Sequence, residues 1–398
     1  MYREDGMRGP KTIRAGAIAA IVALAAIAPA RAACEVKFGA LGPLSGPAAQ
    51  WGLAVKGAAE FVAAEENAAG GLQVGQEKCR VTVTAFDAKY NAEGAAAGAN
   101  YFVSQGVRFV IGPVGSPEMT GVKPIAARNN LLVMGDSFAK NAIGPQWPLV
   151  FHSGPGPSGW APSIVDVAKQ TYGIKSVVIV APNDQGGTDI ASVDAEAYRR
   201  HGVEPAEEYY QRGTSNFAAI AARIIARNPD AVDTASSPPG DAGVIVKQLR
   251  QAGYKGVLGR LGGSGTEEIA RVAGGMDVLQ NFYWYENVVV DERLKALGER
   301  YRQLVGAERP ENTLFYPFVA ATRMVTKAIA KAGTATDTKA VAAALRTLPV
   351  DDPDFGQGLW IGQDFYGINQ ELSFPFGIGL IVDGKPRPIA KHEAATGK

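Results

Sequence analysis

The sequence predicts an α/β fold of two lobes, each with a mainly parallel sheet covered by helices. Three observations support this. Short β-branched runs alternate with longer helical patterns, the alternation restarts after a Gly/Pro-rich stretch at 153–159, and long helices follow both rounds. Because open α/β sheets bind ligands at the carboxyl ends of their strands, two facing lobes would enclose a cleft.

The first round of alternation runs from 35 to 134. Apolar residues at helical spacing predict a helix at 49–67, with Trp51, Val55 and Phe61 on one side. The same reasoning predicts strands at 35–41, 81–86, 108–111 and 131–134, and helices at 92–105 and 117–129.

The second round follows the Gly/Pro-rich stretch. It begins with a helix ending near 168. We expect strands at 176–180, 207–210, 231–235 and 256–261, and helices at 188–201, 217–227, 242–252 and 267–274.

The last part of the chain predicts a return to the first lobe. A strand at 282–290 precedes helices at 292–304, 316–332 and 339–348, and strands at 359–361 and 373–382 end the pattern. These helices would cover the first lobe, and the last strand would join the second. We therefore predict an N-terminal lobe of 33–155 plus about 286–370 and a C-terminal lobe of 156–285 plus about 371–398.

Composition excludes several classes of protein. The 398 residues include 40 Lys and Arg against 39 Asp and Glu, which gives no electrostatic reason to bind nucleic acid. Three His and two Cys are too few for a dedicated zinc site, so we expect no metal. A content of 46% hydrophobic residues is that of a globular protein.

The first 32 residues predict a signal peptide. Basic residues precede an apolar run at 17–28, and Ala30-Arg31-Ala32 supplies small residues for cleavage near Ala33. A buried helix or a membrane anchor is the alternative, but the run is shorter than the roughly 20 residues of a span. A lipoprotein is disfavoured because Arg31 does not fit the small residues before a lipidated Cys34.

The two cysteines predict one disulfide in an exported protein. Cys34 and Cys79 each directly precede a predicted strand. If those strands are parallel neighbours, both cysteines lie at the same edge of the sheet. Two unrelated buried thiols are the alternative.

Three motifs suggest enzyme chemistry, and none meets its requirements. Residues 154–159 match G-x-G-x-x-G, but two prolines remove donors that a dinucleotide loop needs, so an inter-lobe linker explains them better. The block GDSF at 135–138 resembles that of GDSL esterases, yet no His stands in an Asp-x-x-His context to activate Ser137. Residues 262–266 end in Thr266 and fail the G-x-S-x-G elbow. We expect a protein without catalytic residues or cofactors.

Several blocks resemble the type I periplasmic binding proteins of the Leu/Ile/Val-binding family. They are VKFGALGPLSGP at 36–47, EENAAGG at 65–71, VIGP at 110–113 and VKQLRQAG at 246–253. The resemblance implies two Rossmann-like lobes that close on a small ligand. It also implies a periplasmic, monomeric receptor that does not span the membrane and delivers its ligand to the permease subunits of an ABC importer.

The resemblance implies a set of ligand-binding residues in the first lobe. Trp51 stands at the position of an aromatic that faces the ligand, and Gly115 and Ser116 match a loop that binds the ligand's carboxylate. The next loop offers Ser137, Phe138 and Ala139, although members that bind amino acids usually have Thr at the last position. Trp51 as a core aromatic and Ser116 as a helix cap are the alternatives.

The second lobe departs from the family pattern. Aromatic positions of the family align with Gln185 and with the segment that includes Ser236 and Pro238. The acid that pairs with a ligand's ammonium aligns with Gly262. Asp184 or Asp136 would have to replace it. Arg260 would either bind a carboxylate or lie solvated at a strand end.

The sequence therefore predicts capture of a branched-chain or other apolar amino acid, or of a related small carboxylate or amide. Because a buried ammonium without an anion is costly, the missing acid predicts that apolar carboxylates or amides bind at least as well as leucine. A ligand-sensing receptor subunit and a secreted GDSL-type esterase are the alternative functions.

Overall fold

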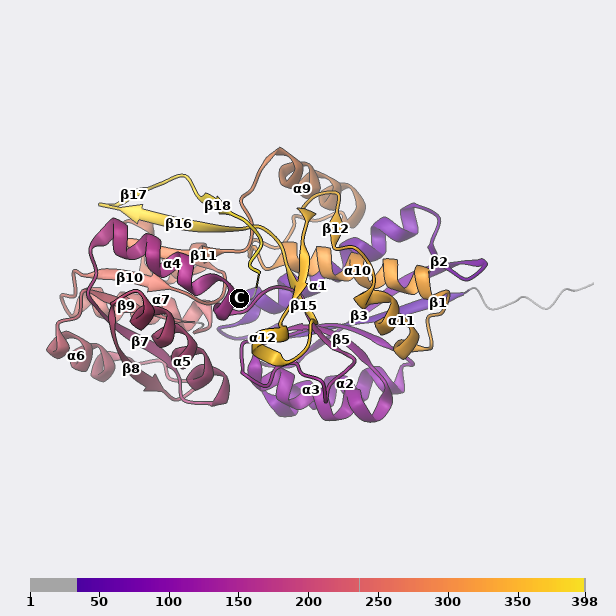
Figure 1. Cartoon of the computed structure of the whole chain (residues 1–398), viewed down its shortest axis with the longest axis horizontal. Helices are drawn as coiled ribbons and strands as arrows, with labels where there is room; N and C mark the ends of the chain where they lie inside the picture. Colours follow the sequence, from indigo (N-terminus) through magenta and orange to yellow (C-terminus); the bar gives the residue numbers. More distant parts are fainter. Residues whose placement is uncertain (1–33, 236, 397–398) are drawn as a thin grey trace, which may run out of the picture. The chain divides into compact units, whose positions relative to one another are not determined.

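The computed structural model describes residues 34–235 and 237–396, and two large sheets dominate them (Figure 1). We call each sheet with its helices a lobe. Residues 1–33, which hold the predicted signal peptide, lie outside the described part. Within the described part, none of the helices combines the length and the apolar character that crossing a membrane requires.

The first sheet is parallel at its centre. Its strands run in the order β14 (Leu359–Ile361), β15 (Glu371–Ser373), β6 (Val150–His152), β5 (Leu132–Asp136), β4 (Phe109–Val114), β1 (Glu35–Gly42), β3 (Glu77–Asp87) and β2 (Leu72–Val74). β1 pairs in parallel with β3 and β4, and only the edge strands β2 and β14 pair antiparallel. This confirms the predicted parallel arrangement.

Helices pack on both faces of the first sheet. Phe38 of β1 packs with α1 (Ala49–Ala68) and α10 (Phe315–Ala332), whereas Leu41 of the same strand packs with α2 (Ala92–Ser104) and α3 (Ser116–Asn129). Opposite faces are reached because side chains alternate along a strand. α9 (Glu292–Val305) packs on α1 and α11 (Thr338–Arg346) packs on α10, and they complete the cover.

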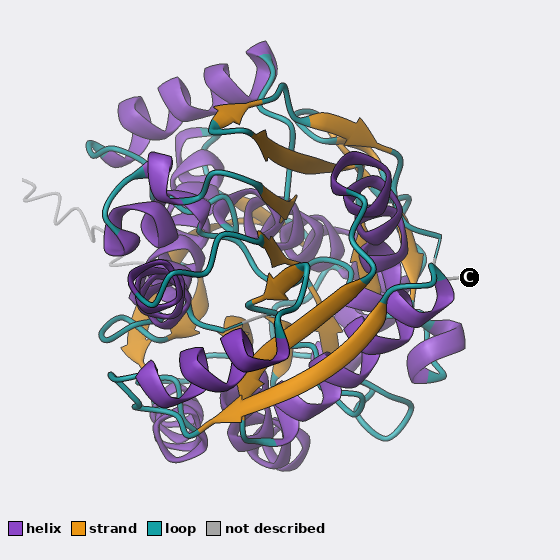
Figure 2. Cartoon of the chain, turned by 90° about the vertical axis from the view of Figure 1, so that its left-hand side faces the viewer, coloured by secondary structure: helices purple, strands orange, loops and turns teal. Residues whose placement is uncertain are grey.

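The second sheet is built in the same way (Figure 2). Its order is β17 (Lys385–Pro386), β16 (Phe376–Val382), β11 (Phe282–Glu286), β10 (Val257–Arg260), β9 (Ala231–Asp233), β7 (Ser176–Pro182) and β8 (Glu204–Tyr210), with β18 (Ala390–His392) paired to β16. α4 (Pro157–Tyr172) and α5 (Gln185–Arg200) cover one face. α6 (Ala218–Arg227), α7 (Pro239–Gln251) and α8 (Thr266–Ala273) cover the other.

The chain passes between the sheets three times: after β6, after β11 and after β15. The predicted strand at 373–382 is two strands in different sheets, because Phe374 and Pro375 interrupt it and proline cannot donate to a ladder. The last crossover therefore follows Ser373, a few residues beyond the predicted boundary. β16 joins the second sheet antiparallel to β11.

A few short elements were not predicted. They are β2, β17 and β18, the helix α12 (Gln363–Tyr366), the turn Met276–Val278 and the hairpin of β12 (Asp351–Asp352) with β13 (Gly356–Gln357). The strand predicted at 282–290 ends at Glu286. Among these differences, the earlier end of β11 moves the carboxyl end of a central strand.

The disulfide between Cys34 and Cys79 is present. The register of β1 on β3 pairs Glu35 with Arg80, so the two residues before them face each other, with their Cα atoms 4.5 Å apart. The Arg80 N–H donates to the Cys34 carbonyl at 2.9 Å beside the bridge. The bridge ties the start of the first strand to its neighbour.

Removing this bridge should destabilise the exported protein. The variant Cys34→Ala/Cys79→Ala should lose about 3–4 kcal/mol of unfolding free energy, because the bridge closes a loop with a sequence separation of 45. Urea unfolding of both proteins without reductant gives the difference. A loss below about 1 kcal/mol, or two alkylated thiols in the mass of the protein, would contradict the prediction.

Candidate functional site

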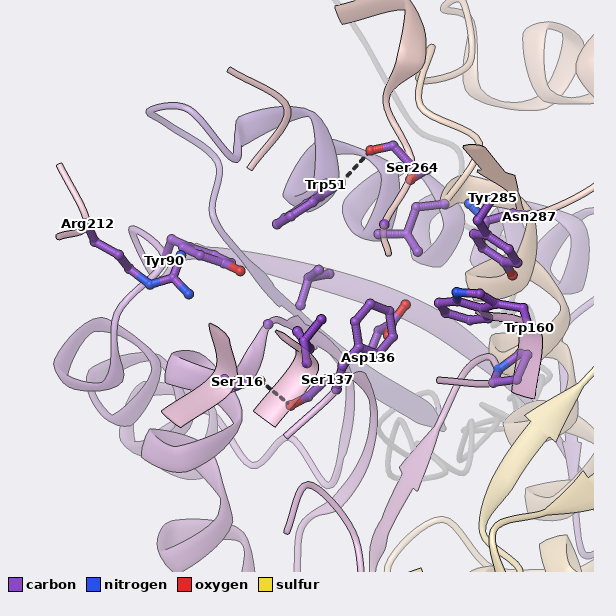
Figure 3. Close-up of a pocket in the computed structure, with 18 residues that line it drawn as sticks. Trp51, Tyr90, Ser116, Asp136, Ser137, Trp160, Arg212, Ser264, Tyr285 and Asn287 are labelled. Atoms are coloured by element: carbon purple, nitrogen blue, oxygen red, sulfur yellow. Dashed lines mark hydrogen bonds between the residues drawn. The ribbon is translucent and has the colours of Figure 1, made fainter. Parts of the chain in front are cut away.

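A cavity lies where the carboxyl ends of the parallel strands of both sheets meet (Figure 3). Its volume is about 40 Å³, which is room for a few waters. The first lobe contributes Trp51, Tyr90, Val114, Gly115, Ser116, Asp136, Ser137, Phe138 and Leu314, and the second lobe with its crossovers contributes Pro155, Trp160, Gly186, Ile190, Arg212, Gly263, Ser264, Tyr285 and Asn287.

Ser116 offers a hydrogen-bond donor to the cavity. The hydroxyl of Ser137 donates to Ser116 Oγ at 3.1 Å, and the N–H of Ala139 donates to the same oxygen at 3.2 Å. Because Ser116 Oγ accepts twice, its own hydrogen remains available to a ligand. Ser116 is the first residue of α3, and its side chain makes no capping bond, so the capping alternative is wrong.

Gly115 allows this loop to turn beside an aromatic ring. Its φ is 97°, and a Cβ at this position would lie 2.4 Å from the ring of Tyr90. A side chain would be both strained and blocked here. The residue after β4 therefore has to be glycine for Tyr90 and Ser116 to share the same wall.

Aromatic rings form one end of the cavity. Trp160 of α4 stacks on Tyr285 of β11 with ring centroids 3.9 Å apart, and Phe138 meets Trp160 edge-on at 5.3 Å. The indole N–H of Trp160 is bound to the carbonyl of Leu261. The indole N–H of Trp160 is thus satisfied, and this residue contributes the apolar surface of its ring to the cavity wall.

Trp51 lines the cavity and also belongs to the core. Its side chain is 4% exposed, and its ring lies 5.6 Å from that of Tyr90. Its indole N–H donates to the carbonyl of Ser264 in the second lobe at 3.2 Å. Trp51 therefore lies both in the core and at the cavity wall, and it connects the lobes.

Further contacts join the two lobes around the cavity. The N–H of Lys140 donates to Asp189 Oδ2 at 2.8 Å, and the N–H of Gly240 donates to the Pro47 carbonyl at 3.2 Å. Gly186 approaches Ser116 so closely that a Cβ on it would lie 2.5 Å from Ser116 Cβ. The walls of the cleft meet, with glycine at the tightest point.

Two charged side chains line the cavity among the described residues: Arg212 and Asp136. Arg212 forms an ion pair with Asp184, and its guanidinium lies 4.7 Å from the centre of the Tyr90 ring. Its Nη1 is buried without a hydrogen-bond partner. Asp184 also caps α5 by accepting from the N–H of Gly187, so its carboxylate is fully used.

Asp136 is different because its carboxylate has no partner. It ends β5, and its backbone carbonyl accepts the Gly115 N–H at 2.6 Å. The side chain is 7% exposed, and Oδ1 is buried without a hydrogen bond. Burial raises the pKa of Asp136 to about 7; the nearby His152 opposes this rise and Glu371 adds to it.

The structure brings five of the predicted site residues together at the cavity: Trp51, Gly115, Ser116, Ser137 and Phe138. The remaining predicted residue of the first lobe, Ala139, does not line it but contributes its N–H to Ser116. This uses the donor that we expected to be free for a ligand.

Two of the predicted residues of the second lobe, Gln185 and Gly262, lie one position before a residue that lines the cavity. Gln185 is exposed at the start of α5, and Gly186 lines the cavity instead. Gly262 does not line it, whereas Gly263 and Ser264 do. Pro238 is the buried residue before α7, away from the cavity, and Ser236 lies outside the described residues.

The expectation that Arg260 lies solvated at a strand end is wrong. Its side chain is 0% exposed, and it donates to the carbonyls of Ser237, Gly263 and Ser264 at 3.0–3.3 Å. Burial lowers its pKa to about 10, and the nearby Asp233 opposes this shift. Arg260 thus holds the loop after β10 in place.

Sequence reasoning missed most of the second-lobe wall. Trp160, Arg212, Tyr285 and Asn287 were not predicted, nor was Tyr90 of the first lobe. Their shared signal is position, because Arg212 follows β8, and Tyr285 and Asn287 lie at the end of β11. Polar and aromatic residues at strand ends would have indicated them.

Comparison with known proteins identifies similar chains. A family model described as Periplasmic binding protein matches residues 35–370. The Leu/Ile/Val-binding protein BraC3 of Rhizobium johnstonii is 29% identical over 335 residues, covering 82% of this chain and 88% of that protein.

Solved structures share the fold. The branched-chain amino acid transporter substrate-binding protein LivJ of Streptococcus pneumoniae, in complex with isoleucine, has a TM-score of 0.74 and 21% identity, covering 90% of this chain and 100% of that one. An ABC-transporter solute-binding protein of R. palustris in complex with benzoate has a TM-score of 0.72 and 16% identity, covering 91% and 96%.

The stability of the protein should depend on the ionisation of Asp136. A carboxyl whose pKa rises on folding, here from 3.8 to about 7, keeps its proton in the folded protein after the unfolded chain has lost it. Its favourable contribution is therefore complete below about pH 4 and is lost as pH rises to about 7. Between pH 5 and 8 this loss should be about 2–3 kcal/mol.

The variant Asp136→Asn should lack this dependence. Urea unfolding of both proteins at pH 5, 6, 7 and 8 should show the wild type losing stability relative to the variant as pH rises. Parallel profiles across this range would show that Asp136 titrates as it does in the unfolded chain.

Proposed function

Because this chain belongs to the periplasmic binding protein family, we propose that it is the substrate-binding component of an ABC importer. Its ligand is a branched-chain or other apolar amino acid, or a related small carboxylate or amide. The names of the relatives support this choice, since one is a Leu/Ile/Val-binding protein and two structural neighbours hold isoleucine and benzoate.

The observation that carries the proposal is a small cavity with walls from both lobes and a hydroxyl donor in its wall. Ser116 can donate to a carboxylate or to a carboxamide oxygen, and the rings of Trp51 and Trp160 offer apolar surface to the ligand's body. A ligand that touches both walls favours the arrangement in which the lobes meet.

Delivery requires an exported receptor and a membrane partner. We propose that residues 1–32 are a signal peptide cleaved near Ala33, that the mature protein is a periplasmic monomer, and that it hands its ligand to permease subunits. The family supports the export, since its members are periplasmic.

The proposed role is binding without chemical conversion. The relatives are binding proteins. The hydroxyl of Ser137 is bound to Ser116 Oγ and not to a histidine, and a serine nucleophile needs such a base. The esterase alternative therefore loses its main support.

A thermal-shift screen tests the proposal. Amino acids, aromatic acids, short-chain amides and dicarboxylates would each be added to the mature protein at millimolar concentration. A ligand present at 100 times its dissociation constant should stabilise the protein by about 2.7 kcal/mol. We expect an apolar amino acid or small carboxylate to give the largest shift. No shift from any of these compounds would contradict the proposed ligand class.

Replacing Ser116 should weaken binding of the best ligand from this screen. Ser116→Ala should cost about 1.5–3 kcal/mol, because it removes a hydrogen bond to a charged group. Calorimetry measures the loss. Ser104→Ala is the matched control, because its exposed hydroxyl bonds to Tyr101 at the end of α2. Equal affinities of Ser116→Ala and the control would exclude Ser116 from the site.

A further inference from the structure

The charges around the cavity do not balance. Arg212 carries a positive charge, but Asp184 neutralises it in an ion pair. Asp136 is the one carboxyl among the described residues that line the cavity, and when it ionises no cationic side chain bonds to it. A buried carboxylate without a partner is costly, so its presence at the cavity wall requires an explanation.

The surroundings of Asp136 do not supply a counter-ion. The nearby His152 is fully buried, and its Nδ1 lies 3.2 Å from Glu371 Oε1, so any positive charge on the imidazole is already matched. Glu371 also accepts the Gly156 N–H at 2.8 Å. Glu371 thus has two partners, whereas His152 Nε2 is buried without one, and neither group makes a hydrogen bond to the Asp136 carboxyl.

The side chains beside Asp136 suit a cation. Trp160, Tyr285 and Phe138 form a continuous group of rings, and ring faces attract positive charge. Asp136 lies close to Tyr285. Burial is the main cause that raises the pKa of the Tyr285 phenol, and the negative charge of Asp136 is the second cause. In Figure 3, Arg212 and Tyr90 lie on the opposite side of the cavity from Trp160 and Tyr285.

We propose that the ligand carries a positively charged amino group, and that Asp136 is its counter-ion. This inference rests on the proposed function and narrows its ligand class to zwitterions. It also changes the expectation that the missing acid at Gly262 lets apolar carboxylates or amides bind at least as well as leucine. The second lobe lacks the usual acid, and a carboxylate of the first lobe takes its place.

Asp136 and the hydroxyl of Ser116 both line the cavity from the first lobe. Asp136 precedes Ser137, whose hydroxyl bonds to Ser116, so the anionic partner and the carboxylate-binding hydroxyl lie on adjacent loops of one lobe. A ligand with its ammonium and carboxylate close together fits this arrangement. α-Amino acids with apolar side chains are therefore favoured over their deaminated acids.

Matched pairs of compounds test the inference by calorimetry. The pairs are leucine with 4-methylpentanoate, phenylalanine with 3-phenylpropanoate, and 4-aminobutanoate with butanoate. In whichever pair binds, the amino compound should bind the wild type at least tenfold more tightly than its partner. Asp136→Asn should remove that difference by weakening the amino compound at least tenfold, while the deaminated compound changes less than twofold.

The variant should fold, because the Asp136 side chain makes no hydrogen bond that asparagine would lose. Thermal unfolding would check this. Asp166→Asn is the matched control, since Asp166 is exposed on α4 and bonds to Gln170. It should leave all affinities unchanged.

Tighter binding of the deaminated compound, or an unchanged ratio in Asp136→Asn, would overturn the inference and leave the proposed function intact. A lack of binding by all six compounds together with a negative thermal-shift screen would overturn the proposed ligand class and the inference with it.

Discussion

The cavity depends on one constraint, which is the common direction of the central strands. In each lobe the parallel strands end at the same edge of the sheet, and many of the residues that line the cavity lie within a few residues of such an end. Ser116 follows β4, Asp136 ends β5, Arg212 follows β8 and Ser264 follows β10. Reversing the direction of any one of these strands would move the residues at its carboxyl end to the opposite edge of the sheet, away from the cavity.

Because of the three crossovers, residues from both lobes form the cavity. The chain leaves and re-enters each sheet. For this reason α4 follows β6 of the first lobe, yet its Trp160 packs in the core of the second lobe. Trp51 reaches across to the Ser264 carbonyl, and Gly186 meets Ser116 where only a hydrogen atom fits. A ligand in the cavity therefore contacts both lobes, and its affinity includes the free energy of bringing them together.

The polar groups of the cavity fall into satisfied and unsatisfied sets. Arg260, Glu371 and Asp184 are bound by neighbouring protein groups and hold loops and helices in place. The Ser116 hydrogen, Asp136 Oδ1 and Arg212 Nη1 have no such partners. Groups that the protein leaves unsatisfied are those that a ligand can satisfy, which separates binding residues from positioning residues at this site.

The alternation of strands and helices was predictable from the sequence because each element follows its own periodicity. The disulfide was also predictable, since two strand starts in parallel register bring Cys34 and Cys79 together. The division of 373–382 was not, because nothing local shows that Pro375 separates strands of different sheets. The site residues of the first lobe were easier to predict, because they lie next to glycine turns that the sequence shows.

The second-lobe wall was harder to predict because its contributions depend on tertiary placement. Gly186 replaced Gln185 at the cavity because α5 begins at residue 185 and its next residue faces the first lobe. From the sequence, Arg260 is expected to be exposed. It is buried because the loop after β10 covers it and accepts its hydrogen bond. Burial of this kind depends on distant segments, which no local pattern contains.

Small-angle scattering tests most directly the claim that the lobes close around a ligand. The radius of gyration should fall when the best ligand of the screen saturates the wild type and the Gly298→Ala control, whose new methyl group would meet Arg309 at an ordinary 3.8 Å. It should not fall in Gly186→Ala, because the added methyl group would collide with Ser116 at 2.5 Å. An unchanged radius in the wild type, or equal contraction in all three proteins, would contradict the account.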